Sequence, residues 1–176
     1  SLKNGDYGVL LVKFPLNTFN TYNTYSQYKT FNDAISREGM ILAEGTPCCD
    51  TLLIHPQTTA WSMFNNGENK GLDELNKAFI EATHILERKH TQFHLGDETL
   101  LERHGHIEGN ALVIGEMRYT TVIVLPDTIL FDSTKELLSE YRRNGGKFVT
   151  AEELPENVII DNPNITYTIR KYDGFD

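Results

Sequence analysis

Three residues follow strand-like segments of the sequence and could form a binding site. His55 ends the apolar run 51–54, Asp127 comes just after the run 122–125, and Trp61 lies in the segment after His55. Parallel strands bring their carboxyl ends to one edge of a sheet, where α/β folds bind ligands, so we expect His55 and Asp127 to line one crevice. An exposed Trp beside polar groups is a usual platform for the apolar C–H face of a sugar ring. The three residues therefore predict a substrate-binding site for carbohydrate.

A structural role for the same residues is the alternative. His55 and Asp127 would then cap nearby backbone groups, and Trp61 would pack beneath its own loop or against a neighbouring domain. The segment 57–70 is predicted to be a long loop that carries Trp61, and long loops in compact domains often have a function. Both interpretations stay open at the level of sequence.

Two adjacent thiols, Cys48 and Cys49, are the only cysteines. A cysteine nucleophile needs a tight turn from strand to helix and a His partner. This pair instead precedes a strand, at the amino end of the predicted sheet, and adjacent cysteines bridge only with strain. We therefore expect structural thiols.

The remaining polar residues do not predict a catalytic group, a metal site or a cofactor site. Among the histidines only His104 and His106 are close in sequence, and zinc needs three or four ligands in a fixed geometry. The acidic pairs 97–98 and 152–153 join neighbouring residues, whereas a glycosidase needs two carboxyl groups that face each other across a cleft.

Charge and hydropathy exclude two classes of partner. The net charge of −9 argues against nucleic acid, whose binding proteins gather Lys and Arg on one face. No segment approaches the roughly 20 apolar residues of a membrane span, so no membrane partner is expected. The chain starts at Ser1 without Met, which predicts that it is part of a longer soluble protein. The sequence leaves a cytoplasmic or periplasmic location open.

Strands and helices alternate along the chain, which predicts an α/β fold. The expected form is a three-layer α/β/α arrangement with a mainly parallel sheet and helices on both faces. The predicted strands are 51–55, 91–95, 122–125 and 147–150, with further strands at 8–14, 158–160 and 165–172. The predicted helices are 31–43, 72–88, 98–103 and one that Asp132 or Ser133 would cap before Gly145 and Gly146 end it.

Three further local expectations concern the segments between these elements. The polar and aromatic run 17–28 lacks helical periodicity and predicts an irregular segment. Asp97 is predicted to cap the helix 98–103. The segments 111–114 and 117–125 flank Gly115 and Glu116, which predicts a hairpin whose second strand continues into the central sheet.

The segment 34–61, AISREGMILAEGTPCCDTLLIHPQTTAW, resembles the start of a class I glutamine-amidotransferase-like (flavodoxin-like) domain of bacterial glycoside hydrolases. The order is a helix, a Gly-x-Pro turn, Asp50, a strand that ends in His55 and Pro56, and then Trp61. FHLGDE at 93–98 and GGKFV at 145–149 continue the same order. Similar domains follow the catalytic barrel of family 42 β-galactosidases and occur in α-L-rhamnosidase-like enzymes.

This resemblance implies a non-catalytic accessory domain of a multidomain glycoside hydrolase, in which the amidotransferase nucleophile is lacking. It implies a connector or remnant of a preceding domain over 1–30, the α/β domain over 31–152, and a β extension over 153–176 that leads to the next domain. The implied partners are the catalytic barrel of the parent chain, a further copy in an oligomer, and the carbohydrate substrate of the parent. The alternative is a stand-alone α/β hydrolase or small-ligand domain that binds sugar at the strand carboxyl ends.

Overall fold

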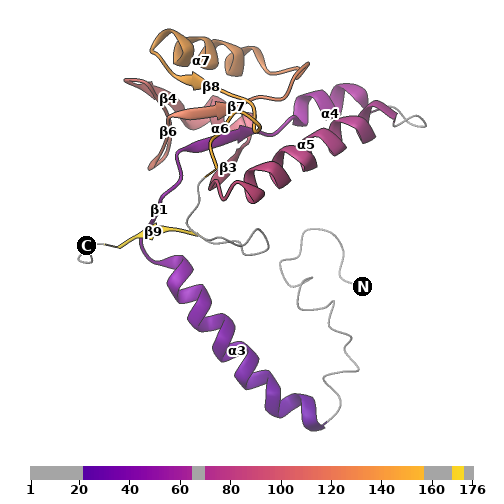
Figure 1. The fold of residues 1–176 in the computed structure, drawn as a ribbon, viewed down its shortest axis with the longest axis vertical. Helices are drawn as coiled ribbons and strands as arrows, with labels where there is room; N and C mark the ends of the chain where they lie inside the picture. The colour runs from indigo at the N-terminus through magenta and orange to yellow at the C-terminus, as the bar shows by residue number, and fades with distance from the viewer. Residues whose placement is uncertain (1–21, 65–69, 157–167, 173–176) are drawn as a thin grey trace. The chain divides into compact units, whose positions relative to one another are not determined.

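The computed structural model describes residues 22–64, 70–156 and 168–172. Contacts divide the chain into two units, one of Ser1–Thr46 with Arg170–Asp176 and the other of Pro47–Ile169 (Figure 1). The segments 8–14 and 158–160, which the sequence predicts as strands, lie outside the described residues. The expected domain boundaries near residues 30 and 152 stay predictions.

The first unit is built on one long helix, α3 (Tyr22–Ala43). The predicted irregular segment is therefore wrong for residues 22–28, where the helix has already begun. Tyr28, Phe31 and Ile35 explain the difference, because they follow one another at helical spacing and extend an apolar stripe beyond the predicted start. Lys29 adds an exposed ion pair with Asp33 at 2.6 Å, one helical turn away.

A short strand pair follows this helix. Strand β1 (Thr46–Pro47) is hydrogen-bonded to β9 (Arg170–Lys171), which is the described part of the predicted strand 165–172. Arg170 donates from Nε to the Glu44 carbonyl at 2.7 Å and from Nη2 to the Gly45 carbonyl at 2.8 Å. These bonds satisfy carbonyl groups at the end of α3 that have no partner within the helix.

A four-stranded parallel sheet forms the centre of the second unit. Its order is β3 (Phe93–Gly96), β2 (Thr51–Ile54), β7 (Thr121–Ile123) and β8 (Lys147–Phe148). The chain moves outward from β2 in both directions, so the strand order reverses between β2 and β7. The predicted α/β fold with a mainly parallel sheet is confirmed at this level.

Burial on both faces explains why the central strands are so apolar. Leu52 and Ile54 of β2 lie in one core cluster, while Leu53 between them lies in the other. Helices α6 (Glu98–His104) and α7 (Asp132–Arg143) supply side chains to the first cluster. Helix α5 (Lys70–Arg88) supplies side chains to the second, with α7 and α5 on opposite sides of the sheet in Figure 1.

A separate antiparallel sheet packs beside α6 and α7. It consists of β4 (Gly105–Glu108), β5 (Ala111–Ile114) and β6 (Met117–Tyr119), and the predicted hairpin of β5 and β6 is confirmed. The prediction of one strand over 117–125 is wrong, because β6 and β7 belong to different sheets. The Asp50 carbonyl accepts from both Thr120 and Thr121 at 3.0 and 3.1 Å, which turns the backbone between the two strands.

Helix α4 (Gln57–Met63) occupies much of the segment predicted as a loop over 57–70, so that prediction is wrong for 57–63. Thr58 and Thr59 are β-branched and favour a helix only weakly, which hid it from sequence reasoning. Their side chains bond to other segments, and these tertiary bonds stabilise a helix that intrinsic propensity does not.

The helix ends agree with the sequence at two sites and differ at a third. The side chain of Asp97 accepts from the backbone of Thr99 and Leu100 at 2.8 and 3.0 Å, which confirms the predicted cap. The predicted cap at Asp132 or Ser133 is wrong, since Phe131 precedes the first turn of α7 without a side-chain cap. The predicted left-handed C-terminus of α7 is confirmed by Gly145, whose φ is +84°.

We expect Gly146→Ala to destabilise the second unit by about 2 kcal/mol or more, because the core is close-packed. A Cβ at Gly146 would lie 2.3 Å from the ring of Tyr141, which is fully buried. The matched control is Gly39→Ala in α3, where nothing lies within 4 Å and the change should stabilise the helix. Urea unfolding measures the stability of both variants. Equal stability of Gly146→Ala and the wild type would contradict the prediction.

Candidate functional site

The carboxyl edge of the parallel sheet is where a ligand site is expected, at the point where the strand order reverses between β2 and β7. Three segments meet here: α4 after β2, the start of α6 after β3, and the loop 124–131 after β7. Their side chains decide whether a crevice is left open. Hydrogen bonds between residues far apart in sequence join all three.

Glu98 lies at the centre of these bonds and is fully buried. Its Oε1 accepts a hydrogen bond from the hydroxyl of Thr58 on α4, and its Oε2 accepts one from the backbone N–H of Phe131 at 2.7 Å. A buried carboxylate is costly unless it is hydrogen-bonded, and the first turn of a helix favours its negative charge. One side chain thus connects all three segments.

Thr59 makes a second connection beside it. Its hydroxyl accepts from the Ile129 N–H at 2.8 Å and donates to the Ile129 carbonyl at 3.1 Å. Thr59 is also buried, so the helix α4 is held against the loop after β7 by two bonds to one residue. Hydrogen bonds between the protein's own groups thus join the segments at the point of strand reversal.

His55 lies at this edge, in a structural setting. Its backbone N–H donates to the Gly96 carbonyl at 3.0 Å and extends the ladder of β2 and β3 by one bond. Its ring meets that of Phe79 on α5 edge to face, with centroids 4.9 Å apart. These contacts hold the ring against α5.

Trp61 and Asp127 lie at the surface of the same edge. Trp61 is 63% exposed on α4, so it is not packed beneath a loop in the described part of the chain. Asp127 is exposed at a turn with φ of +56°, a conformation that Asp tolerates better than most residues. No hydrogen bond or ring contact among the described residues joins His55, Trp61 and Asp127. Their role in binding stays a prediction.

Two surface cavities of about 580 and 540 Å³ lie along α7. The larger lies between α6 and α7, and the smaller is lined by α7, the end of β7 and Phe148 of β8. Neither is lined by His55, Trp61 or Asp127. Within the described residues, these open spaces are thus away from the predicted site.

The two thiols differ in their surroundings. Cys48 is exposed, whereas Cys49 is buried in the first core cluster with its Sγ 3.5 Å from the Thr51 carbonyl. Burial raises the pKa of the Cys49 thiol, so less of it is thiolate, the nucleophilic form, at neutral pH. Nearby, Nδ1 of His94 lies 2.9 Å from the hydroxyl of Tyr119. Burial lowers the pKa of this His and raises that of Tyr119 to about 12.

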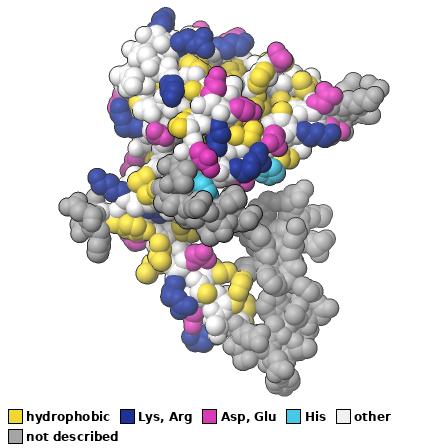
Figure 2. Space-filling view, in the orientation of Figure 1, with side chains coloured by type: hydrophobic (Ala, Val, Ile, Leu, Met, Phe, Trp, Pro, Cys, Tyr) yellow, Lys and Arg dark blue, Asp and Glu magenta, His cyan; other side chains and the backbone are white. Residues whose placement is uncertain are grey.

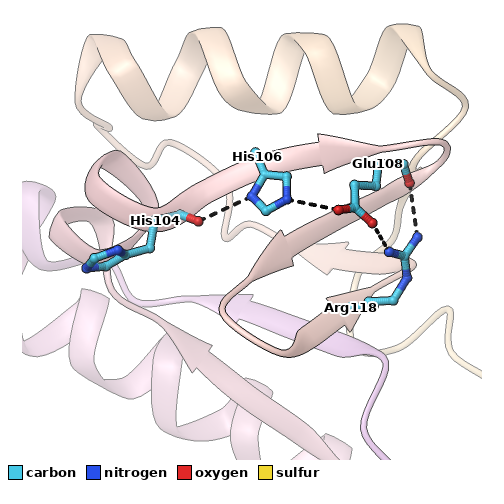
Figure 3. Close-up of polar contacts among 4 residues, drawn as sticks. All are labelled: His104, His106, Glu108 and Arg118. Carbon is cyan, nitrogen blue, oxygen red and sulfur yellow. Dashed lines mark hydrogen bonds and ion pairs between the residues drawn. The ribbon is translucent and has the colours of Figure 1, made fainter.

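A polar cluster on the antiparallel sheet contains the two closely spaced histidines (Figure 3). His106 lies on β4, and its Nε2 is 3.1 Å from Oε1 of Glu108. Arg118 on β6 pairs with the other oxygen of Glu108. The hydrogen bonds from His106 and then Arg118 lower the pKa of Glu108. The ring of His104 points away from the other three side chains, so the two imidazoles do not converge.

The described part of the chain contains neither a cluster that could hold a metal ion nor a helix that could span a membrane. Within residues 22–64, 70–156 and 168–172, no group of three or more His, Cys, Asp or Glu is placed to hold a metal ion. Across the same residues, no helix combines the length and the apolar character needed to cross a membrane.

Comparison with known proteins adds no assignment. No protein-family model matches the chain, and neither a search of curated proteins nor one of solved structures finds a match.

Sequence reasoning missed three residues of this edge, namely the buried Glu98 and Thr59 and the half-buried Thr58. It assigned Glu98 only to the start of a helix. One signal could have identified it, because an acidic residue directly after a strand of a parallel sheet is placed at the carboxyl edge. Its burial depends on α4, which was predicted as loop.

We expect Glu98→Ala to lower the free energy of unfolding by about 1–3 kcal/mol, because it leaves the Thr58 hydroxyl and the Phe131 N–H without their acceptor. The control is Glu136→Ala on α7, which removes an exposed carboxylate. Urea unfolding gives the stability, and hydrogen exchange of the Phe131 amide reports the lost bond directly. An unchanged Phe131 exchange rate in Glu98→Ala would count against this account.

We expect the two thiols to react with Ellman's reagent at different rates in the native protein. Cys48 should react fast because it is exposed, and Cys49 slowly because it is buried and its raised pKa leaves less thiolate. Cys48→Ser should remove the fast phase, and Cys49→Ser should keep it. Fast labelling of Cys49 near neutral pH would show that this thiol is activated after all.

Proposed function

We propose that this chain is a non-catalytic accessory and assembly domain of a multidomain glycoside hydrolase. The glycoside hydrolase class of the longer protein is proposed from a resemblance. Residues 34–61, 93–98 and 145–149 resemble the amidotransferase-like domains of such enzymes. The proposal includes a three-layer, flavodoxin-like arrangement of the α/β unit. The strand order supports it, since a second-first-third-fourth order is that of flavodoxin-like sheets.

The observation that carries the proposal is the closed carboxyl edge. Glu98 binds Thr58 and Phe131, and Thr59 binds Ile129, at the position where related sheets bind their ligands. A domain that uses these groups to join its own loops has none of them free for a substrate. The buried, protonated state favoured for Cys49 also argues against amidotransferase chemistry.

The surface of α4 supports the assembly part of the proposal. Trp61 and Phe64 are 63% and 64% exposed at the end of this helix. Large exposed aromatic side chains on neighbouring positions favour a surface that another domain covers, because Trp is enriched where protein surfaces meet. We propose that the catalytic barrel of the parent chain, or a second copy in an oligomer, covers this surface.

Sugar binding is the second candidate, and the exposure of Trp61 favours it as well. An indole ring at the carboxyl edge can stack on a sugar, with Asp127 as a hydrogen-bond acceptor and His55 nearby. The two candidates use the same ring differently, since one covers it with protein and the other with carbohydrate.

We expect the purified chain to hydrolyse neither nitrophenyl glycosides nor glutamine. The reason is that the residues at the carboxyl edge serve in structural bonds. Turnover that His55→Ala or Asp127→Asn abolishes would overturn the accessory role. The coding sequence upstream of Ser1 is an independent test, because the proposal requires a catalytic barrel in the same parent chain.

Fluorescence separates the two candidates, because Trp61 is the only tryptophan of the chain. We expect solvent-exposed emission with easy quenching by acrylamide, and no saturable change on titration with galactose, rhamnose or their oligosaccharides. A saturable blue shift that Asp127→Asn weakens would favour the sugar-binding candidate. The parent enzyme should instead show a blue-shifted, protected Trp61, since the barrel or a second copy would cover it.

A further inference from the structure

Within the described residues, the outer strand of the parallel sheet has a free edge. β8 is the last strand in the order, and the Val149 N–H donates to the Val122 carbonyl at 3.3 Å. Backbone groups of alternate residues point to opposite sides of a strand, so the N–H and C=O of Phe148 point away from β7. Among the described residues no hydrogen bond to these two groups is recorded. This edge can accept another strand.

An apolar groove lies directly beside this edge. It is the cavity of about 540 Å³ along α7, and its floor consists of Val124, Leu130, Leu138 and Phe148. Phe148 therefore belongs both to the edge strand and to the groove, and α7 lies above β8 in Figure 1. A strand added at the edge would place every second side chain towards this floor.

The charged side chains that line the groove are all basic. Lys135, Arg142 and Arg143 line it without any acidic residue, in a chain whose net charge is −9. Arg142 lies over the Phe148 ring, 4.7 Å from its centroid, and Lys135 pairs with Asp132 at 2.8 Å. No described acidic side chain pairs with Arg142 or Arg143. Figure 2 shows several Lys and Arg side chains at the top of the view, where α7 lies in Figure 1.

We propose that β8 and α7 form a docking site for an extended peptide segment in which apolar and acidic side chains alternate. The backbone of the segment would bond to the N–H and C=O of Phe148, and its apolar side chains would enter the groove. Its carboxylates would meet the guanidinium groups of Arg142 and Arg143, which suit carboxylates well. The rim favours an acidic partner because a basic one would be repelled. This site shares the loop 124–131 with the carboxyl edge, but it uses other residues than His55, Trp61 and Asp127 and does not rest on the proposed function.

The probe is an acetylated, amidated seven-residue peptide in which glutamate and valine alternate. Calorimetry should detect its binding to the full chain, and hydrogen exchange should show the Phe148 amide protected only when the peptide is present. The same peptide with lysine in place of glutamate should not bind. A version with N-methylated backbone amides should bind at least about tenfold more weakly, since each N-methyl group removes a backbone hydrogen bond to the edge strand.

Charge reversal on the protein gives the matched comparison. Arg143→Glu should weaken binding about tenfold, because repulsion replaces attraction at the rim. Lys77→Glu makes the same kind of change on the exposed surface of α5 and should leave the affinity unchanged. Thermal melting confirms that both variants stay folded.

Four results for the peptide and the edge would overturn the proposal. They are no binding at millimolar peptide, equal binding of the N-methylated peptide, equal binding by Arg143→Glu, and a Phe148 amide that is already protected in the free chain. The last would mean that the edge is already paired within the molecule. Self-association of the free chain that Arg143→Glu abolishes would place a second copy at this edge and would overturn the proposal as well.

Discussion

The architecture of the α/β unit depends on one buried carboxylate. A charged group loses its hydration when it is buried, so it stays in the interior only if hydrogen bonds replace the lost water. Glu98 obtains those bonds from Thr58 and Phe131, which lie on two other segments. The need of one side chain for partners thus fixes where α4 begins and where the loop before α7 runs. Thr59 and Ile129 reinforce the same arrangement.

The central sheet explains why this arrangement lies where it does. β2 is buried on both faces and pairs with β3 on one edge and with β7 on the other, so the strand order reverses between β2 and β7. A sheet of this order leaves a gap between the loops after β2 and β7. Many proteins use such a gap for a ligand, whereas here Thr58, Thr59 and Glu98 join the segments around it by hydrogen bonds. The free surfaces are consequently the outer ones: the exposed end of α4 and the edge at β8.

The elements that the sequence predicted well are those whose pattern comes from the sheet and its main helices. Apolar runs that alternate with helices, such as the helix at 72–88, predicted the parallel sheet. Asp97 predicted the start of α6. Tertiary bonds explain the errors. Helix α4 is stabilised by bonds to residues 40 and 70 positions away, which no local pattern contains. Phe131 precedes α7 without a side-chain cap, because a phenyl ring has no acceptor atom, and its backbone N–H is bound by Glu98.

For the candidate site, too, the sequence predicted what depends on local patterns and missed what depends on tertiary contacts. Position after a strand correctly located His55 at the carboxyl edge, yet it could not tell that its ring packs on Phe79. Conversely, nothing in a Gly-Gly turn reveals that the next strand is an outer one with a free backbone edge. That property follows from the order of all four strands, and it makes Phe148 part of an interaction surface. Where the loops at the carboxyl edge bond to one another, an outer surface such as the β8 edge offers the backbone groups and cationic side chains that the proposed docking needs.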